Sequence, residues 1–222
     1  MLKMIKTKLQ VALDVLNIKD AKRIVEEVID FVDIIEVGTP LIKKEGIKAV
    51  EEIKKSFGKY DKPILADMKT MDVGYLEVKI AAEAGADIIT VMGAAADKTI
   101  EEAIKAKKEF KVEIMVDLMN VQNMIERIKW LNTKDIDYIL LHIGKDQQIQ
   151  GISPLEFVRR YRGYIEKSLA VAGGINDKSL IDILEYKPEI VVVGSFIIKS
   201  DRPRESAKKL RDIINNYYKE WV

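Results

Sequence analysis

The sequence predicts an α/β fold, a single closed (β/α)8 TIM barrel that spans residues 1–222. Eight short apolar segments of strand length alternate with longer amphipathic segments from one end of the chain to the other. No Ser-, Pro- or Gly-rich linker interrupts this series, and 222 residues suit one such barrel. An open doubly wound sheet would show the same alternation, because periodicity alone does not reveal closure. Eight βα pairs in this length favour the barrel.

The eight predicted strands are apolar almost throughout, as expected for parallel strands that are covered on both faces. In chain order they are residues 9–15, 33–38, 63–70, 87–93, 112–119, 138–144, 168–175 and 190–198. Helical stripes of apolar residues lie between and after them, and these would cover the outer side of the sheet. One stripe comprises Ala21, Ile24, Val25, Val28 and Ile29, with Asp20 at the expected N-cap.

Composition restricts the possible partners and chemistry. The 37 basic and 36 acidic residues give a net charge of +1, which offers no basic surface for nucleic acid and no polybasic membrane anchor. The absence of cysteine excludes disulfides, thiolate metal sites and thiol catalysis. No segment resembles a signal peptide or a membrane helix of about 20 apolar residues. We therefore expect a cytoplasmic protein without a membrane partner.

Charged residues close several of the predicted strands, where a (β/α)8 barrel carries its catalytic groups. Asp67 and Lys69 lie two apart on one strand, so their side chains share a face, and Asp72 follows in the loop. This spacing can place an ammonium between carboxylates, which would keep Lys69 protonated and able to stabilise an enolate or donate a proton. A buried ion-pair network would use the same residue types. Their position at strand ends favours catalysis.

Three further strand ends carry polar candidates. Glu36 and Asp67 could supply hard oxygen ligands to Mg²⁺, or to Mn²⁺ in its place, with water and substrate completing the coordination. The single histidine, His142, is a candidate acid or base near neutral pH, and a structural role is equally open. Asp117 ends the fifth strand, where a hydrogen-bonding role and a structural role are both open.

Glycines follow the last two predicted strands. Gly173 and Gly174 come after the seventh strand, and Gly194 and Ser195 lie after the apolar core of the eighth. Barrels of this class often bind phosphate there through backbone N–H groups. Two tight turns are the alternative interpretation. The pair of positions favours a phosphate site.

Seven segments occur in an order that is typical of one enzyme group. They are LQVALD, IIEVGTPLIKKEG, ADMKTMD, AGADIITVMGAA, LLHIGKDQQ, VAGGI and VVVGS. From about Leu9 to Ile198 the chain resembles the 3-hexulose-6-phosphate synthases of the orotidine-5'-phosphate decarboxylase suprafamily. The resemblance implies a ribulose-phosphate-binding barrel and a homodimer.

The resemblance also implies a reaction and a set of roles. D-Ribulose 5-phosphate and formaldehyde would combine reversibly, with Mg²⁺, to give D-arabino-3-hexulose 6-phosphate, serving formaldehyde fixation or pentose phosphate supply. Lys69 would stabilise a 1,2-enediolate, Asp14 would orient Lys69, and His142 would transfer protons. Asp72 would reach into the partner subunit's site. The glycines and Ser195 would bind the phosphate.

Two positions depart from the patterns of the group. The decarboxylase relatives tend to carry arginine where this chain has Ser195, and Lys145 stands where synthases often have an apolar or aromatic residue and decarboxylases an arginine. A 3-keto-L-gulonate-6-phosphate decarboxylase is therefore the alternative enzyme. A non-catalytic phosphosugar-binding barrel is the alternative of another class, and the intact charged residues at the strand ends argue against it.

Overall fold

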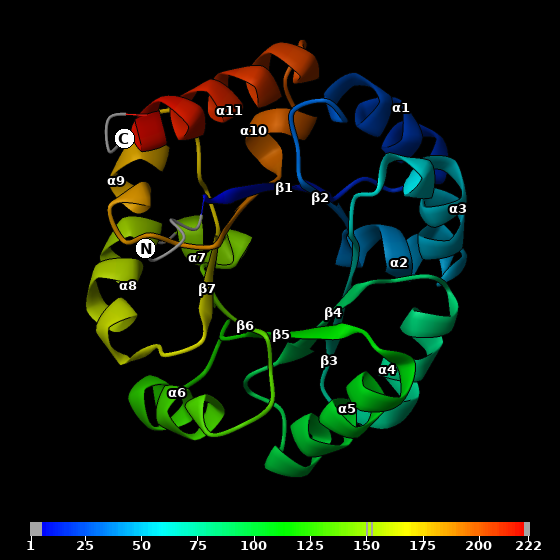
Figure 1. Ribbon diagram of the computed structural model, residues 1–222, viewed down its shortest axis with the longest axis vertical. Coiled ribbons are helices and arrows are strands. Elements are labelled where there is room, and N and C mark those ends of the chain that lie inside the picture. The colour runs from blue at the N-terminus through cyan, green and yellow to red at the C-terminus, as the bar shows by residue number, and fades with distance from the viewer. Residues whose placement is uncertain (1–5, 150, 152, 220–222) are drawn as a thin grey trace.

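The computed structural model describes residues 6–149, 151 and 153–219. Eight parallel strands follow one another in chain order around a closed barrel, and the last pairs with the first (Figure 1). They are β1 (Lys8–Leu13), β2 (Ile34–Val37), β3 (Ile64–Thr70), β4 (Ile88–Met92), β5 (Glu113–Asp117), β6 (Tyr138–His142), β7 (Ser168–Ala172) and β8 (Ile190–Val193). The predicted closed (β/α)8 barrel is confirmed.

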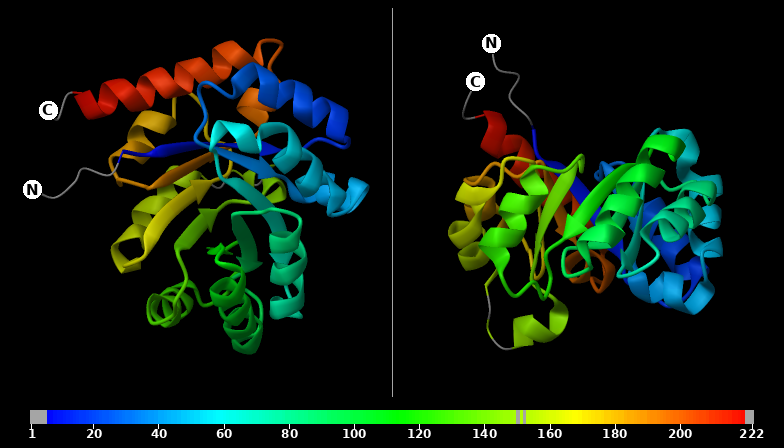
Figure 2. Two further views of the ribbon diagram at one scale, coloured as in Figure 1. Left: turned by 45° about the vertical axis from the view of Figure 1, so that its right-hand side comes forward. Right: turned by 90° about the horizontal axis from the view of Figure 1, so that it is seen from below.

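Helices form an outer layer around the strands (Figures 1 and 2). They are α1 (Ile18–Val28), α2 (Thr39–Glu45), α3 (Lys48–Phe57), α4 (Gly74–Glu83), α5 (Asp97–Phe110), α6 (Met124–Asn132), α7 (Lys145–Ile149), α8 (Pro154–Tyr161), α9 (Leu180–Leu184), α10 (Ser195–Ile198) and α11 (Pro203–Lys219). Short 3₁₀ turns follow α3 and α8. The long α11 packs against α1, α9 and α10 on one side of the barrel. None of the described helices has the length and apolar character needed to cross a membrane.

The predicted strands coincide with the observed ones to within a few residues, except at the C-terminal end of the last. Residues 190–198 were expected as one strand, but β8 ends at Val193 and residues 195–198 form α10. The apolar run continues because Ile197 is fully buried in the outer core, so hydrophobicity there reflects a packed helical turn. The prediction of a continuous strand was wrong.

Helix α1 shows how the outer layer is built. Its N-cap is Asn17, whose side chain accepts a hydrogen bond from the backbone N–H of Asp20 at 2.8 Å. The N-cap was expected at Asp20, three residues further along the chain, and that prediction was wrong. The predicted stripe from Ala21 to Ile29 is buried against the strands. Each fully buried aliphatic side chain of this kind contributes about 1.5–3 kcal/mol.

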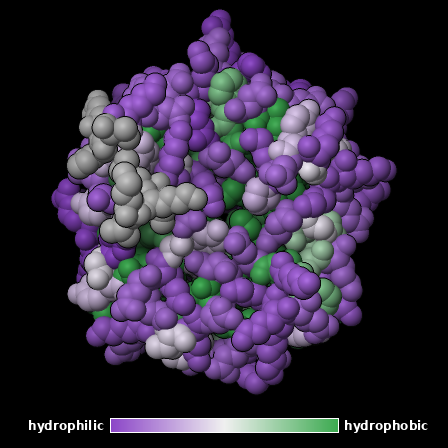
Figure 3. Space-filling model, viewed as in Figure 1, coloured by the Kyte–Doolittle hydropathy of each residue, from purple (hydrophilic) through white to green (hydrophobic). Residues whose placement is uncertain are grey.

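Two apolar cores result from this arrangement. The larger lies between strands and helices, and a smaller one fills the barrel itself, where Leu65, Met115 and Ile190 are examples of its fully buried side chains. Seen along the barrel, hydrophilic side chains cover the outer ring and hydrophobic ones show at the centre (Figure 3). Towards the C-terminal ends of the strands the interior becomes polar, with buried Gln10, Glu36 and Asp117. The fold therefore concentrates buried polar groups at one end.

Candidate active site

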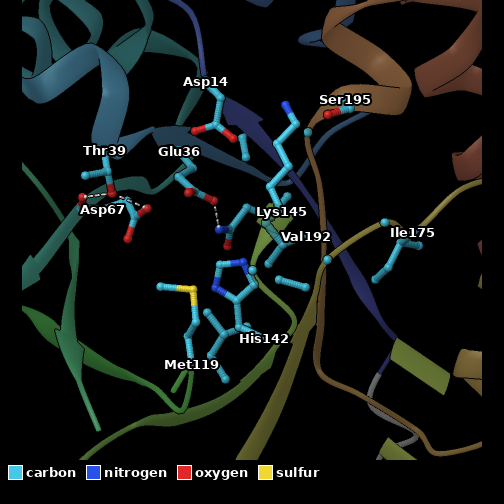
Figure 4. A pocket seen from close by; sticks show the side chains of 18 of the residues that line it. Asp14, Glu36, Thr39, Asp67, Met119, His142, Lys145, Ile175, Val192 and Ser195 are labelled. Atoms are coloured by element: carbon cyan, nitrogen blue, oxygen red, sulfur yellow. Dashed lines mark hydrogen bonds between the residues drawn. The ribbon is translucent and has the colours of Figure 1, made fainter. Parts of the chain in front are cut away.

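A cavity of about 630 Å³ opens at the C-terminal ends of the strands. This volume suits a small ligand such as a phosphorylated sugar. Nine of the ten residues predicted for the site line it: Asp14, Glu36, Asp67, Lys69, His142, Gly173, Gly174, Gly194 and Ser195. Figure 4 shows Asp14, Glu36 and Asp67 on one side of the cavity and Ser195 on another.

Lys69 lies at the centre of the charged cluster. Its ammonium nitrogen is 3.0 Å from Asp67 Oδ2 and 3.1 Å from Asp117 Oδ2. Burial alone would lower the pKa of Lys69, but the negative charges of Asp67 and Asp117 outweigh it, and the pKa lies above its ordinary value. The side chain is therefore an ammonium group over the whole physiological pH range, able to stabilise negative charge on a ligand oxygen.

Asp117 connects Lys69 to the histidine. The carboxylate is fully buried, and its Oδ2 atom lies 2.7 Å from His142 Nδ1, while its Oδ1 atom accepts the backbone N–H of Met119 at 2.8 Å. Burial would raise the pKa of Asp117, but the electrostatic interaction and hydrogen bond with His142, together with the charge of Lys69, lower it to about 2. Asp117 therefore orients His142 by hydrogen bonding, the role that its position at a strand end had left open.

Two threonine hydroxyls hold Asp67 in place. Thr39, the first residue of α2, donates to Asp67 Oδ2 at 2.6 Å, and Thr90 of β4 donates to Oδ1 at 2.7 Å (Figure 4 shows Thr39). Sequence reasoning missed both residues. Thr39 follows the predicted second strand directly, so its position beside the charged strand ends was a usable signal, whereas Thr90 stands inside an apolar strand.

Three carboxylates face the same part of the cavity. Burial, followed by the charges of Asp67 and Asp14, raises the pKa of Glu36 well above its ordinary value, although Gln10 donates a hydrogen bond to Glu36 at 2.6 Å. Burial and the charge of Asp67 also raise the pKa of Asp14. Negative charge is therefore in excess here, and it favours a cation as a ligand.

The oxygen donors fit the hard divalent ion expected from the sequence. Glu36 and Asp67 lie on adjacent strands, and a cation beside them would relieve their mutual repulsion. Within the described part of the chain, no three His, Asp or Glu side chains are close enough to hold a metal ion by themselves. Water and substrate oxygens would have to provide the remaining ligands.

Bare backbone forms the opposite wall. Gly173 and Gly174 adopt positive φ angles of 106° and 69°, and a Cβ on Gly173 would lie only 2.3 Å from the carbonyl oxygen of Ile143. A side chain is therefore excluded at Gly173. Gly194 and Ser195 follow the adjacent strand β8, where α10 begins.

Asp72 is the one predicted site residue that the chain does not bring to the cavity. It is exposed just before α4, and its carboxylate accepts the backbone N–H of Val73 at 2.8 Å. The expectation that Lys69 lies between Asp67 and Asp72 was wrong within one chain, because the loop turns outward after Thr70. The second carboxylate at Lys69 is that of Asp117.

Comparison with known proteins identifies the group. Residues 7–210 match the model of the Orotidine 5'-phosphate decarboxylase / HUMPS family. The chain belongs to this family. Within the family, it is 40% identical over 207 residues to the 3-hexulose-6-phosphate synthase of Bacillus subtilis, covering 93% of this chain and 98% of that protein.

Solved structures of family members agree with the fold. The crystal structure of 3-hexulose-6-phosphate synthase from Salmonella typhimurium superposes with a TM-score of 0.91 at 36% identity, covering 95% of this chain and 100% of that one. The structure of 3-keto-L-gulonate-6-phosphate decarboxylase from Vibrio cholerae gives 0.80 at 30% identity, covering 96% and 99%. The chain is similar in sequence and structure to both kinds of family member, and more so to the synthase.

Proposed function

We propose that the chain is a 3-hexulose-6-phosphate synthase, a lyase that reversibly joins D-ribulose 5-phosphate and formaldehyde to give D-arabino-3-hexulose 6-phosphate. One observation carries the proposal: the Lys69 ammonium and His142 share Asp117 at the edge of a cavity that suits a phosphosugar. Similarity to named synthases over almost the whole chain supports the same reaction.

In this proposal each group has a role in the first step. His142 Nδ1 is held by Asp117, so Nε2 is the ring nitrogen available to take the C1 proton of the sugar. The Lys69 ammonium stabilises the negative charge that develops on the adjacent sugar oxygen, giving the 1,2-enediolate. Asp14 contributes negative charge that helps to keep Lys69 protonated. C1 of the enediolate then attacks the carbonyl carbon of formaldehyde, a carbon–carbon bond forms as the C=O π bond breaks, the carbonyl group at C2 is restored, and His142 returns its proton to the new alkoxide oxygen.

Glu36 and Asp67 would hold Mg²⁺, or Mn²⁺ in its place. When bound, the ion supplies Lewis-acid stabilisation of negative charge on substrate oxygens. The backbone at Gly173, Gly174 and Gly194, with Ser195, would bind the sugar phosphate on the opposite wall of the cavity. Metal and phosphate would thus fix the two ends of the substrate.

The active unit in this proposal is a cytoplasmic homodimer. Four apolar side chains around Asp72 are exposed: Met71, Val73, Leu76 and Ile80. Such a cluster suits burial against a second copy of the chain. Dimerisation through this face would allow Asp72, which lies outside its own cavity, to reach the partner's site.

The test is formaldehyde consumption by the purified protein with ribulose 5-phosphate, with and without Mg²⁺. Metal-dependent consumption with formation of the hexulose phosphate is the expected result. Lack of turnover with retained phosphosugar binding would point instead to a non-catalytic barrel.

Decarboxylation of 3-keto-L-gulonate 6-phosphate is the second candidate. It is favoured by the similarity to the Vibrio cholerae enzyme and by Lys145, a cation on the cavity wall that points towards Asp14 and Ser195 in Figure 4. CO₂ release from the gulonate, without formaldehyde consumption from ribulose 5-phosphate, would assign the chain to that activity.

A further inference from the structure

Two buried threonines on adjacent strands differ in one respect. Thr90 of β4 and Thr70 of β3 are 2% and 1% exposed. The hydroxyl of Thr90 makes two hydrogen bonds, to Lys69 and Asp67. The hydroxyl of Thr70 has no hydrogen-bond partner among the described residues. The Thr90 hydroxyl is buried and forms hydrogen bonds with two charged site residues, Lys69 and Asp67. The proposed chemistry gives this hydroxyl no role.

Strand β3 is irregular where it carries Lys69. The pairing register between β3 and β4 shifts between Ala66 and Thr70. Lys69 within this shift has a φ angle of 48°, a left-handed conformation that non-glycine residues rarely adopt. Regular strand geometry would not give Lys69 this direction, so its conformation needs support from the surroundings.

Thr90 provides that support from the neighbouring strand. The backbone N–H of Lys69 donates to Thr90 Oγ1 at 3.0 Å, in place of a regular ladder bond. The same hydroxyl donates its proton to Asp67 Oδ1 at 2.7 Å. One side chain therefore fixes the backbone of the ammonium donor and the orientation of the carboxylate beside it.

We propose that Thr90 is a positioning residue of the reaction, which holds Lys69 in its left-handed conformation and Asp67 in the rotamer that faces it. Thr39 completes the arrangement from the opposite side, because its hydroxyl lies 2.6 Å from Asp67 Oδ2 and 2.8 Å from the Asp67 carbonyl oxygen and shares its one proton between these two acceptors. Both oxygens of the Asp67 carboxylate are thereby fixed by neutral donors. Of the two threonines, Thr90 is the one that also forms a hydrogen bond with Lys69.

The kinetic part of this inference rests on the proposed function, and its test uses three variants of the full chain. Thr90→Val keeps the shape and removes the hydroxyl. Thr90→Ser restores the hydroxyl. Thr70→Val is the matched control, since it removes a buried hydroxyl without partners from the adjacent strand. Steady-state kinetics with ribulose 5-phosphate and formaldehyde, thermal unfolding and a crystal structure are recorded for each.

The expected result is a split between turnover and binding. In Thr90→Val, kcat falls about 10- to 100-fold, the range that a displaced catalytic group costs, while KM for ribulose 5-phosphate changes less than about threefold. Thr90→Ser stays within about threefold of the unmodified chain, and so does Thr70→Val. A Thr90→Val enzyme that turns over like Thr70→Val would overturn the proposal, as would loss of activity explained entirely by a lower Tm.

The crystal structures keep this inference separate from the proposed function. If the unmodified chain turns over neither substrate, the proposed function fails, and the geometry of Thr90→Val decides the positioning role. Support would be a Lys69 residue that leaves the left-handed region or an ammonium that leaves Asp67. Unchanged Lys69 and Asp67 geometry would refute it. Should Thr90→Val not fold, Thr90→Ala takes its place in the same comparison.

Discussion

The two ends of the barrel use the same kinds of charged residue in opposite ways. At the N-terminal ends of the strands, an aspartate precedes each of β2, β4 and β6 and accepts the first backbone N–H groups of the strand before it: Asp33 from Leu9 at 2.7 Å, Asp87 from Ile64 at 2.8 Å and Asp137 from Ile114 at 2.8 Å. Each aspartate also pairs with a cation from an outer helix, which is Arg211, Lys54 and Lys107 respectively. Each of these three aspartates therefore has a cationic partner.

At the C-terminal ends the charges do not balance. Three buried carboxylates, those of Glu36, Asp67 and Asp117, and the more exposed carboxylate of Asp14 share the ammonium groups of Lys69 and Lys145 and the ring of His142. The cost of this excess appears as raised pKa values for Glu36 and Asp14. Balanced pairs stabilise strand pairing, whereas an unbalanced cluster needs a ligand to complete it. The following predictions test this difference, from the largest expected effect to the smallest.

Removing the shared ammonium should have the largest effect. Lys69→Ala is expected to lower kcat by about 1,000-fold or more, with a smaller change in phosphosugar affinity, because the charge acts mainly on the enediolate. Steady-state kinetics together with equilibrium binding of ribulose 5-phosphate measure the two quantities. Lys107→Met at the other end of the barrel is the control, and it should keep kcat. Near-normal turnover in Lys69→Ala would remove the assigned role.

Mixing two inactive variants tests the contribution of Asp72 across a dimer. Lys69→Ala and Asp72→Ala should each be inactive alone, whereas a co-refolded mixture should recover up to about one quarter of the activity, since half of the dimers are mixed and each has one intact site. Sedimentation analysis establishes the dimer in parallel. Absence of recovery in a confirmed mixed dimer would place the action of Asp72 within its own chain.

The stability of the metal-free protein should depend on pH through the Glu36 carboxyl group. Its pKa is raised in the folded chain, so its contribution to stability is fully present below the ordinary value of 4.5 and is lost as pH rises through the raised value. The metal-free protein should therefore lose stability relative to Glu36→Gln as pH increases above 4.5, and Mg²⁺ should restore it. Urea unfolding at several pH values, with and without Mg²⁺, measures this difference. Glu36→Gln should also weaken Mg²⁺ binding at least about tenfold. An identical pH dependence in both proteins would contradict the prediction.

Substitutions at the N-terminal end of the barrel should change only the stability of the protein. This effect should be the smallest of those predicted. Asp137→Asn keeps an acceptor for the Ile114 N–H and loses the charge that pairs with Lys107, so the free energy of unfolding should fall by about 0.5–1 kcal/mol. Asp137→Ala also leaves the N–H without a partner and should lose about 1–3 kcal/mol. Urea unfolding measures both, and kcat should remain unchanged. A large loss of kcat would show that the two ends are not independent.

The features that could be predicted from the sequence are those that hydrophobicity encodes directly. Buried parallel strands are continuous apolar runs, so the eight strands and their polar ends were visible, and with them Lys69 and His142. The end of β8 could not be predicted, because Ile197 in the packed turn that follows is as apolar as the residues of the strand. The choice between Asp72 and Asp117 depends on the direction of a loop, which spacing along the chain does not determine.

Thr90 shows a different limit. Threonine is common in buried strands, and its hydroxyl has meaning here only because β3 shifts register against β4 and brings the backbone of Lys69 opposite to it. The register shift depends on how β3 and β4 pair, so the sequence of either strand alone does not reveal it. Thr70 is a residue of the same type with the same burial, yet its hydroxyl has no such role.

The protonation of Lys69 has a consequence for chemical selectivity. Formaldehyde is a strong electrophile that converts neutral amines and thiols into covalent adducts. The raised pKa of Lys69 leaves almost no neutral amine at this side chain, so in the proposed reaction it would stabilise the enediolate without forming an adduct with formaldehyde. The chain has no cysteine to be modified in its place. In the proposed reaction, the carboxylates around the ammonium would thus protect Lys69 from the formaldehyde that it helps to convert.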